Sequence, residues 1–178
     1  LQHQDGHSHL IASTIPNLKA YDPAYAYEIA IIIQDGLDRM YKKNEDVFYY
    51  LTLENENYVH PKLPNYDITD GIINGMYCIK NNLKSKAIKV QLLASGPMVN
   101  EIIKASKLLK EDWNIDASIW SVTSYSELHK EAESINRWNN LHPDSTNKVS
   151  YLEKNLKIIN GPVIAVSDYV KLVAEQIA

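Results

Sequence analysis

The stretch Ala87–Thr123, AIKVQLLASGPMVNEIIKASKLLKEDWNIDASIWSVT, decides the fold of this 178-residue chain. It begins with an apolar run, 87–94, that is typical of a buried strand and ends at the turn Ser95–Pro97. Residues 98–112 then carry apolar side chains at every third or fourth position, which predicts a helix, and 117–123 is again typical of a strand. Strand, helix and strand in this order indicate two parallel strands joined by a crossover helix.

Toward the C-terminus the alternation of helices and strands continues. A serine stands three residues before a glutamate at two places, Ser124 and Ser150, and this spacing is typical of a capping box that begins a helix. The expected elements are a helix from Ser124 that ends before Pro143, a shorter helix after Ser150, a strand at 162–166 and a helix from Asp168 onward.

The amino-terminal third contains a second unit of the same kind. Asp22 and Pro23 indicate a helix start, because aspartate accepts hydrogen bonds from the first free amides and proline has no amide hydrogen to lose. A helix is therefore predicted over 24–41, between strands at 14–20 and 47–53. Its apolar face is expected to consist of Ile29, Ile32, Ile33, Leu37 and Met40.

A polar stretch joins the two units. Residues 54–71 include Pro61 and Pro64 and have no sustained apolar period, which indicates a connection, whereas 71–80 is compatible with a helix or a strand. The complete pattern predicts an α/β fold of mainly parallel sheets flanked by helices.

Aromatic side chains are expected mainly in the core. Trp113, Trp120 and Trp138 are predicted to lie in the core or an interface, with Trp113 on the apolar face of the 98–112 helix. Tyr21 and Tyr25, close to the start of the first long helix, are likewise predicted to pack inside.

The composition excludes several classes of protein. Hydrophobic residues make up 45% of the chain, and 18 Lys and Arg stand against 22 Asp and Glu, a net charge of −4. This balance argues against binding of nucleic acid or anionic lipid through positive charge. No apolar run is long enough for a membrane helix, and no signal peptide is recognisable. The single cysteine, Cys78, fits a reducing compartment, so a cytoplasmic protein is expected.

The clearest candidate site is the segment His3–His9, which holds three of the six histidines and Asp5. Clustered imidazoles are suited to proton transfer or to capture of a polar substrate. A solvated terminal segment is an alternative. A metal-dependent hydrolase is another, because His7-Ser8-His9 has the His-x-His spacing of some metal sites. The more distant ligands would then come from His60, His129 and His142.

Several blocks in fixed order resemble one family. These blocks are LQHQDGHSH (1–9), IPNLKAYDPAYAYEIA (15–30), LENENY (53–58), VQLLASG (90–96), SVTSYSEL (121–128), INRWNNLHP (135–143) and SDYVKLVAEQ (167–176). They are similar to the homodimeric, thiamine diphosphate-dependent decarboxylating subunits of bacterial pyruvate dehydrogenases, over essentially the whole chain. One departure is Gln4, where the family usually has glutamate.

The resemblance implies a transketolase-like fold and an activity in pyruvate metabolism, downstream of glycolysis. Pyruvate would be decarboxylated on thiamine diphosphate held by Mg²⁺, and the acetyl unit would pass to a lipoyl group of the dihydrolipoyl acetyltransferase subunit. His3 matches the active-site histidine beside the substrate adduct. More distant similarity to transketolase would instead give Asp5 and His9 a role in substrate binding. A second copy of the subunit is the other implied partner.

The resemblance also implies domain bounds and missing parts. Residues 1–60 correspond to the end of the pyrimidine-binding middle domain, 61–86 to a connection, and 87–178 to a C-terminal domain lacking its last portion. The start at Leu1 suggests a fragment. The family's Gly-Asp-Gly segment with its downstream Asn, and its activating glutamate, are not in this chain. The chain alone is therefore expected to bind no cofactor and to be inactive. A non-catalytic, transketolase-like assembly module is a further alternative.

Overall fold

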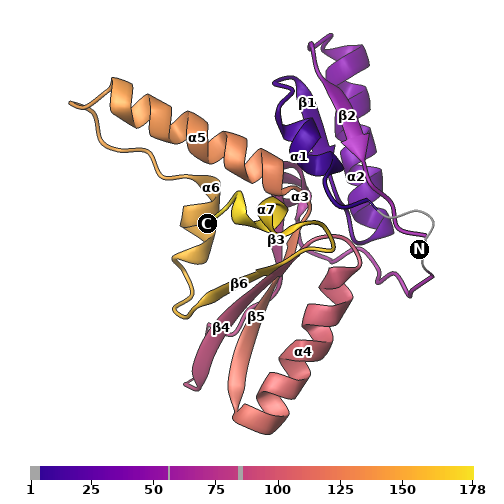
Figure 1. Ribbon diagram of the computed structural model, residues 1–178, viewed down its shortest axis with the longest axis vertical. Coiled ribbons are helices and arrows are strands. Elements are labelled where there is room, and N and C mark those ends of the chain that lie inside the picture. The colour runs from indigo at the N-terminus through magenta and orange to yellow at the C-terminus, as the bar shows by residue number, and fades with distance from the viewer. Residues whose placement is uncertain (1–4, 56, 84–85) are drawn as a thin grey trace.

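The smaller of two sheets lies in the amino-terminal part of the computed structural model, which describes residues 5–55, 57–83 and 86–178 (Figure 1). Its strands β1 (Leu18–Tyr21) and β2 (Phe48–Leu51) are parallel and are connected through α2 (Ala26–Leu37). The predicted strand–helix–strand unit is therefore confirmed, with shorter strands than expected. The remaining elements of this part are α1 (Ser8–Ser13) before β1 and a π-helical turn, η1 (Asp38–Lys42), after α2.

The larger sheet has four strands in the order β3-β5-β4-β6. Its members are β3 (Met76–Lys80), β4 (Ile88–Ala94), β5 (Ile115–Val122) and β6 (Val163–Val166). β4 pairs in parallel with both β5 and β6, whereas the edge strand β3 is antiparallel to β5. The expected α/β fold of mainly parallel strands is confirmed.

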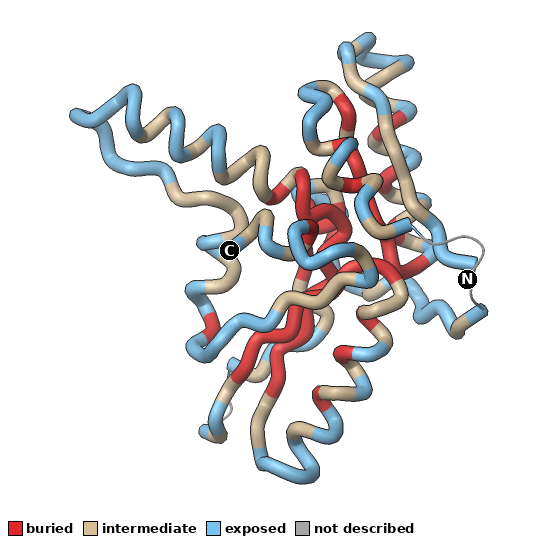
Figure 2. Tube along the Cα trace, viewed as in Figure 1, coloured by how far each residue is buried: buried red, intermediate tan, exposed pale blue. Residues whose placement is uncertain are grey.

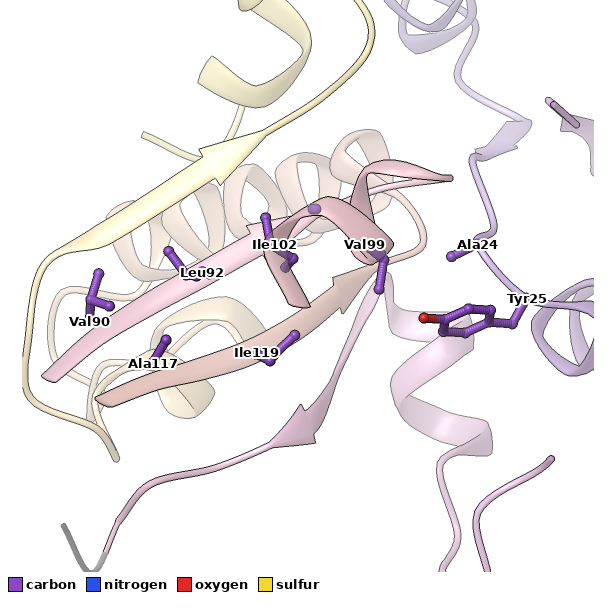
Figure 3. Close-up of a cluster of buried hydrophobic side chains, with 9 residues drawn as sticks. Ala24, Tyr25, Val90, Leu92, Val99, Ile102, Ala117 and Ile119 are labelled. Carbon is purple, nitrogen blue, oxygen red and sulfur yellow. The ribbon is translucent and has the colours of Figure 1, made fainter. Parts of the chain in front are cut away.

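Helices cover both faces of this sheet, because its strands alternate apolar side chains between the two sides. Leu92 and Ile119 pack with Ile102 of α4 (Met98–Trp113) on one face (Figure 3). Leu93 and Trp120 lie in a second buried cluster on the other face. That cluster includes residues of α5 (Tyr125–Leu141), α6 (Tyr151–Leu156) and α7 (Lys171–Glu175). Full burial of each such side chain stabilises the fold by about 1.5–3 kcal/mol.

The two predicted serine caps are confirmed. The Ser124 hydroxyl oxygen accepts a hydrogen bond from the Glu127 amide at 3.0 Å, and Ser150 accepts one from the Glu153 amide at 3.2 Å. α5 therefore begins beside the sheet, where its first residues are buried, and projects outward into solvent along its length (Figure 2).

The range 61–86, expected to be a connection, contains regular structure. α3 (Thr69–Asn74) ends at Gly75, whose φ of +105° is favourable only for glycine, and β3 follows directly. Met76 and Tyr77 are buried in the larger sheet, which therefore begins before residue 87. The mixed signal of 71–80 is explained, because this stretch holds the end of a helix and a strand.

Two predicted apolar faces are only partly buried. Ile32 of α2 is fully buried, but Ile33 and Leu37 are 49% and 53% exposed, because they lie on the side of α2 turned away from the junction with the larger sheet. Trp113 is 72% exposed at the last residue of α4, so it lies outside the core, and its place in an interface stays a prediction. Trp120 is buried as predicted, and so is Tyr21.

Glu28 of α2 connects the two sheets. Its side chain is fully buried and accepts hydrogen bonds from the Tyr77 hydroxyl of β3 and the Ser121 hydroxyl of β5, each at 2.7 Å. It also accepts bonds from the amides of Ala24 and Tyr25, at 2.5 and 3.1 Å, and so caps its own helix. Burial raises the pKa of Glu28, and these hydrogen bonds oppose the rise.

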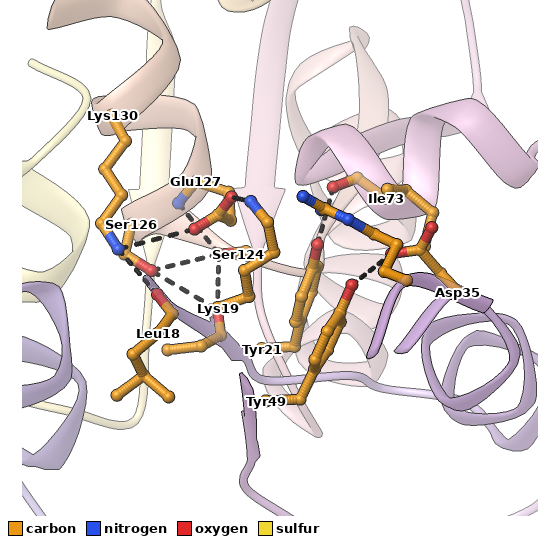
Figure 4. Close-up of polar contacts among 12 residues, drawn as sticks. Leu18, Lys19, Tyr21, Asp35, Tyr49, Ile73, Ser124, Ser126, Glu127 and Lys130 are labelled. Atoms are coloured by element: carbon orange, nitrogen blue, oxygen red, sulfur yellow. Dashed lines mark hydrogen bonds and ion pairs between the residues drawn. The ribbon is translucent and has the colours of Figure 1, made fainter. Parts of the chain in front are cut away.

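A second set of contacts joins β1 to the start of α5 (Figure 4). Lys19 forms an ion pair with Glu127, and the Ser124 hydroxyl donates to the carbonyl of Ala20 at 2.6 Å. The Tyr21 hydroxyl reaches the carbonyl of Ile73 at 2.9 Å. The small sheet is thus fixed to the large one through polar groups at several points. Among the described residues, no helix has the length and apolar character needed to cross a bilayer.

Candidate functional site

His3, the residue predicted to be catalytic, lies outside the described residues. The described part of the candidate segment begins at Asp5, whose carboxylate accepts hydrogen bonds from the amides of His7 and Ser8 at 3.1 and 3.0 Å and from the Ser8 hydroxyl. Partial burial raises the pKa of Asp5, but these bonds and the charge of His9 outweigh it, and the pKa is lowered. Asp5 therefore stabilises the turn into α1 from a solvent-exposed position.

His9 points into the protein. Only 4% of the residue is exposed, and its Nε2 lies 2.8 Å from the Thr52 hydroxyl oxygen. Its ring packs edge-on against Tyr169, with 4.8 Å between ring centroids, and lies 5.7 Å from the ring of Tyr50. Burial lowers the pKa of His9 to about 4, against an opposing effect of Asp5, so the imidazole is neutral at pH 7.

Asp22 lies behind Thr52 and is buried. Thr52 donates its hydroxyl hydrogen to Asp22 Oδ1 at 2.8 Å, and the Tyr169 hydroxyl lies 3.5 Å from the same oxygen. Burial raises the pKa of Asp22, and the hydroxyls of Ser95, Thr52 and Tyr169 oppose the rise. The predicted role of Asp22 as the cap of α2 is wrong, because that helix begins later, at Ala26, and Glu28 satisfies the amides that precede it.

The turn after β4 lies against the same carboxylate. Gly96 has a φ of +52°, and a Cβ atom placed on it would lie 2.9 Å from Asp22 Oδ2. The Gly96 amide donates to the Asp22 carbonyl at 3.0 Å. The predicted turn at Ser95–Pro97 therefore packs directly against Asp22 and joins β4 to the small sheet.

A small polar cavity separates this group from α7. It is lined by His9, Asp22, Ser95, Ser124, Tyr125, Ser126, Tyr169, Val173 and Gln176, and it has room for about one water molecule. Within the described ranges, the buried Oε1 of Gln176 has no hydrogen-bond partner. A bridging water is the simplest group that would satisfy this atom.

The other histidines lie apart from this site. His60 Nδ1 accepts from the Ala26 amide, while His129 and His142 pair through Nδ1 with the carbonyls of Gln176 and Trp138. Across residues 5–55, 57–83 and 86–178, no three His, Cys, Asp or Glu side chains gather in a way that could hold a metal ion.

Known proteins match almost the whole length of the chain. Residues 1–61 match the family model of the pyruvate dehydrogenase E1 component middle domain, and 75–178 match that of the transketolase-like C-terminal domain. The chain is 51% identical over 177 residues to a pyruvate dehydrogenase E1 component of Pseudomonas aeruginosa. The chain belongs to the pyruvate dehydrogenase E1 family. A second member, from Escherichia coli K12, is 45% identical over 178 residues.

In both E1 relatives the match covers 99% of this chain but 20% of the relative, so the chain spans about a fifth of their length. Solved structures agree on the fold. Transketolase from Campylobacter jejuni superposes with a TM-score of 0.68 at 18% identity, over 99% of this chain and 23% of that one. Transketolase from Leishmania mexicana gives 0.57 at 15% identity, over 96% and 21%. The predicted family and the transketolase-like fold are confirmed.

The side chains behind the candidate segment of this E1 family member were not predicted from the sequence. Thr52 and Tyr169 follow β2 and β6 and meet at Asp22 only because the two sheets pack together. One available signal was the position of Asp22 and Thr52 directly after parallel strands, since polar groups of functional sites gather at the carboxyl ends of such strands.

Proposed function

We propose that this chain is part of an E1 subunit that decarboxylates pyruvate with thiamine diphosphate and transfers the acetyl unit to lipoyl groups. The observation that carries the proposal is the match to E1 relatives over 99% of the chain, which includes the histidine-rich segment. His3 is the proposed catalytic residue, acting by a hydrogen bond or proton transfer to the oxygen derived from the pyruvate carbonyl.

We assign the cofactor to parts of the protein outside this chain. The cavity beside Asp22 has room for about one water molecule, which is far less than thiamine diphosphate needs, and both buried carboxylates are engaged by groups of the chain itself. Thiamine diphosphate with Mg²⁺ would supply the carbanion chemistry when bound. The contribution of this chain is then to carry and hold the histidine segment. The division into a middle-domain part, 1–60, and a C-terminal part also belongs to this proposal. The start of the C-terminal part, predicted at residue 87, is moved back to β3 at Met76, because that strand pairs with β5 of the larger sheet.

Partners and compartment are also part of the proposal. A second E1 copy and the dihydrolipoyl acetyltransferase subunit are the proposed partners. The exposed apolar face of α2, with Ile33 and Leu37, supports cover by further protein in the intact subunit or dimer. The unpaired thiol of Cys78 supports a cytoplasmic location.

The hydrolase alternative has less support. His9 is buried, and its Nε2 is paired with Thr52, so this nitrogen is not directed toward an ion shared with His7. Membership of the E1 family independently favours the decarboxylase.

The test uses the full-length protein with thiamine diphosphate and Mg²⁺ and measures CO₂ release from pyruvate. His3→Gln is expected to lower kcat by about a hundredfold or more, the usual contribution of a general acid or base. His142→Gln, a change at the exposed end of α5, is the matched control and should leave kcat unchanged. Absence of CO₂ release by the wild-type protein would refute the proposed function. CO₂ release by residues 1–178 alone would refute the assignment of the cofactor to other parts.

A further inference from the structure

We propose that Asp22, Thr52 and His9 form a hydrogen-bonded relay that positions the amino-terminal segment against the C-terminal part of the chain. The inference rests on the proposed function for one step only, that the positioned segment carries the catalytic His3. The three residues are positioning residues.

The direction of the relay follows from the donors available. Thr52 has a single hydroxyl hydrogen and donates it to Asp22 Oδ1 at 2.8 Å, whereas the carbonyl of Tyr21 is farther away, at 3.4 Å. The Thr52 oxygen therefore accepts from His9 at 2.8 Å, which places the imidazole hydrogen on Nε2. A neutral imidazole is the form that burial favours here. Each member of the relay thus has one defined role, and the position of the His9 ring is set by Asp22.

The relay and its neighbours lie at the carboxyl ends of two pairs of parallel strands, one pair in each sheet. Asp22 follows β1, Thr52 follows β2, Gly96 follows β4 and Tyr169 lies beyond β6. Gly96 allows the carboxylate to approach the turn after β4, and Tyr169 contacts both the carboxylate and the His9 ring. The position of α1 is therefore determined jointly by the two sheets.

A backbone hydrogen bond also joins the chain before α1 to the C-terminal part of the protein. The Gly6 carbonyl accepts a hydrogen bond at 2.8 Å from the amide of Val170, immediately before α7. The segment is thus held on one side by His9 through the relay and on the other by the backbone next to Tyr169. A shift of about 1 Å in a catalytic group can lower the rate a hundredfold, so loss of the relay is expected to act on kcat.

The first experiment measures the relay without using activity. Exchange of the imidazole C2 hydrogen for deuterium, followed by mass spectrometry in the full-length protein, reports each histidine separately. His9 is expected to exchange slowly and the exposed His7 rapidly within the same segment. Thr52→Val removes the hydroxyl with little change in volume and should speed exchange at His9 by about tenfold or more, because the ring loses its buried partner.

The second experiment measures the consequence for catalysis. In Thr52→Val the kcat for CO₂ release, per folded active site, should fall by about tenfold or more with KM for pyruvate unchanged, and Thr52→Ser should restore both kcat and slow exchange. Thr14→Val is the matched control, since the Thr14 hydroxyl donates to the carbonyl of Ile11 in α1 and is not a member of the relay. If Thr52→Val fails to fold, Thr52→Ala serves the same purpose.

The outcomes separate the two proposals. Unchanged His9 exchange in Thr52→Val overturns the relay, whereas a loss of activity that only follows the unfolded fraction overturns the link to catalysis. Faster His9 exchange with unchanged kcat overturns the link to catalysis. Faster exchange in a protein whose wild type releases no CO₂ supports the relay and refutes the proposed function.

Discussion

Glu28 and Asp22 are both buried carboxylates at the junction of the two sheets, yet their surroundings differ. Glu28 accepts four hydrogen bonds, two from backbone amides at the start of its own helix and two from hydroxyls of the larger sheet. Asp22 accepts one short bond from Thr52 and one long contact from Tyr169 beside a polar cavity, and the nearby Ser95 hydroxyl also lowers its pKa. A buried carboxylate whose hydrogen-bonding capacity is filled serves to hold elements together. A buried carboxylate with capacity left over can also orient the hydroxyl and imidazole groups beside it.

The largest effect is expected at the fully satisfied site. Glu28→Gln keeps the shape but turns an amide toward groups that are themselves donors, so it leaves buried donors unpaired. The free energy of unfolding is expected to fall by about 3 kcal/mol or more, measured by urea denaturation.

Glu101→Gln provides the control for the Glu28 substitution. Glu101 pairs with Lys104 on an exposed turn of α4, so its replacement should change stability little. Equal losses in the free energy of unfolding for the two substitutions would show that the four hydrogen bonds to Glu28 add no stability beyond that of an exposed ion pair.

The next effect is a pH dependence specific to the Asp22 region. The pKa of His9 falls from 6.5 in the unfolded chain to about 4 in the folded protein, so the unfolded chain binds more protons in this interval. The contribution of His9 to stability is therefore complete above pH 6.5 and is lost as pH falls toward 4, by as much as about 3 kcal/mol.

His9→Gln isolates this contribution, because glutamine retains a donor for Thr52 but does not titrate. The groups that face His9 are Asp5, Tyr50, Tyr169 and, through Thr52, Asp22. Burial raises the pKa of Asp22, which gives the opposite slope, so the difference between wild type and variant is the quantity to measure. Parallel stability curves for the two proteins between pH 4 and 6.5 would contradict a buried, neutral His9.

A smaller effect is expected from Gly96→Ala, which tests how closely the turn approaches Asp22. The left-handed φ of +52° and the 2.9 Å approach of the new Cβ to Asp22 Oδ2 both disfavour alanine. We expect a loss of about 2 kcal/mol in the free energy of unfolding.

In the Asp22→Ala background the steric part should disappear, and the Gly96 substitution should then cost only the backbone strain. A cost that is the same in both backgrounds would indicate that Asp22 and the turn do not interact.

The smallest effect is expected at the serine caps. Ser124→Ala should lower stability by about 1 kcal/mol for the lost cap, plus the bond to the Ala20 carbonyl that joins α5 to the small sheet. Ser150→Ala removes the equivalent cap of α6 and is the matched control. The thermal midpoint should fall more for Ser124→Ala than for Ser150→Ala. The reverse order would show that the bond from Ser124 to the Ala20 carbonyl does not stabilise the junction of the two sheets.

Local patterns in the sequence predicted most of the fold. The caps at Ser124 and Ser150 and the helix over 98–112 depend on nearby residues alone, so spacing was sufficient to find them. The prediction for 71–80 stayed open between helix and strand, because a helix end, a glycine and a strand lie within these ten residues and no single hydrophobic period runs through them. The cap at Asp22 was wrongly predicted because local propensity cannot show which side chain reaches the free amides. In the structure the amides of Ala24 and Tyr25 donate to Glu28.

The candidate site could be predicted only as a segment. The cluster of histidines and its resemblance to a family indicated where chemistry lies, but the burial of His9 depends on Thr52, 43 residues further along the chain. Tyr169, whose hydroxyl contacts the Asp22 carboxylate, lies 147 residues after Asp22 in the sequence. Such contacts are set by tertiary packing, and no pattern within a window of the sequence contains them.

The connection made by Glu28 has a consequence for the order of folding. Its bond to Ser121 spans 93 residues, and its bond to Tyr77 spans 49. During synthesis the carboxylate emerges long before β5, so it must remain solvated or protonated until the larger sheet is complete. Because contacts of such long range close slowly, docking of α2 onto the larger sheet is expected to be a late step of folding, and its apolar side chains stay accessible to solvent until then.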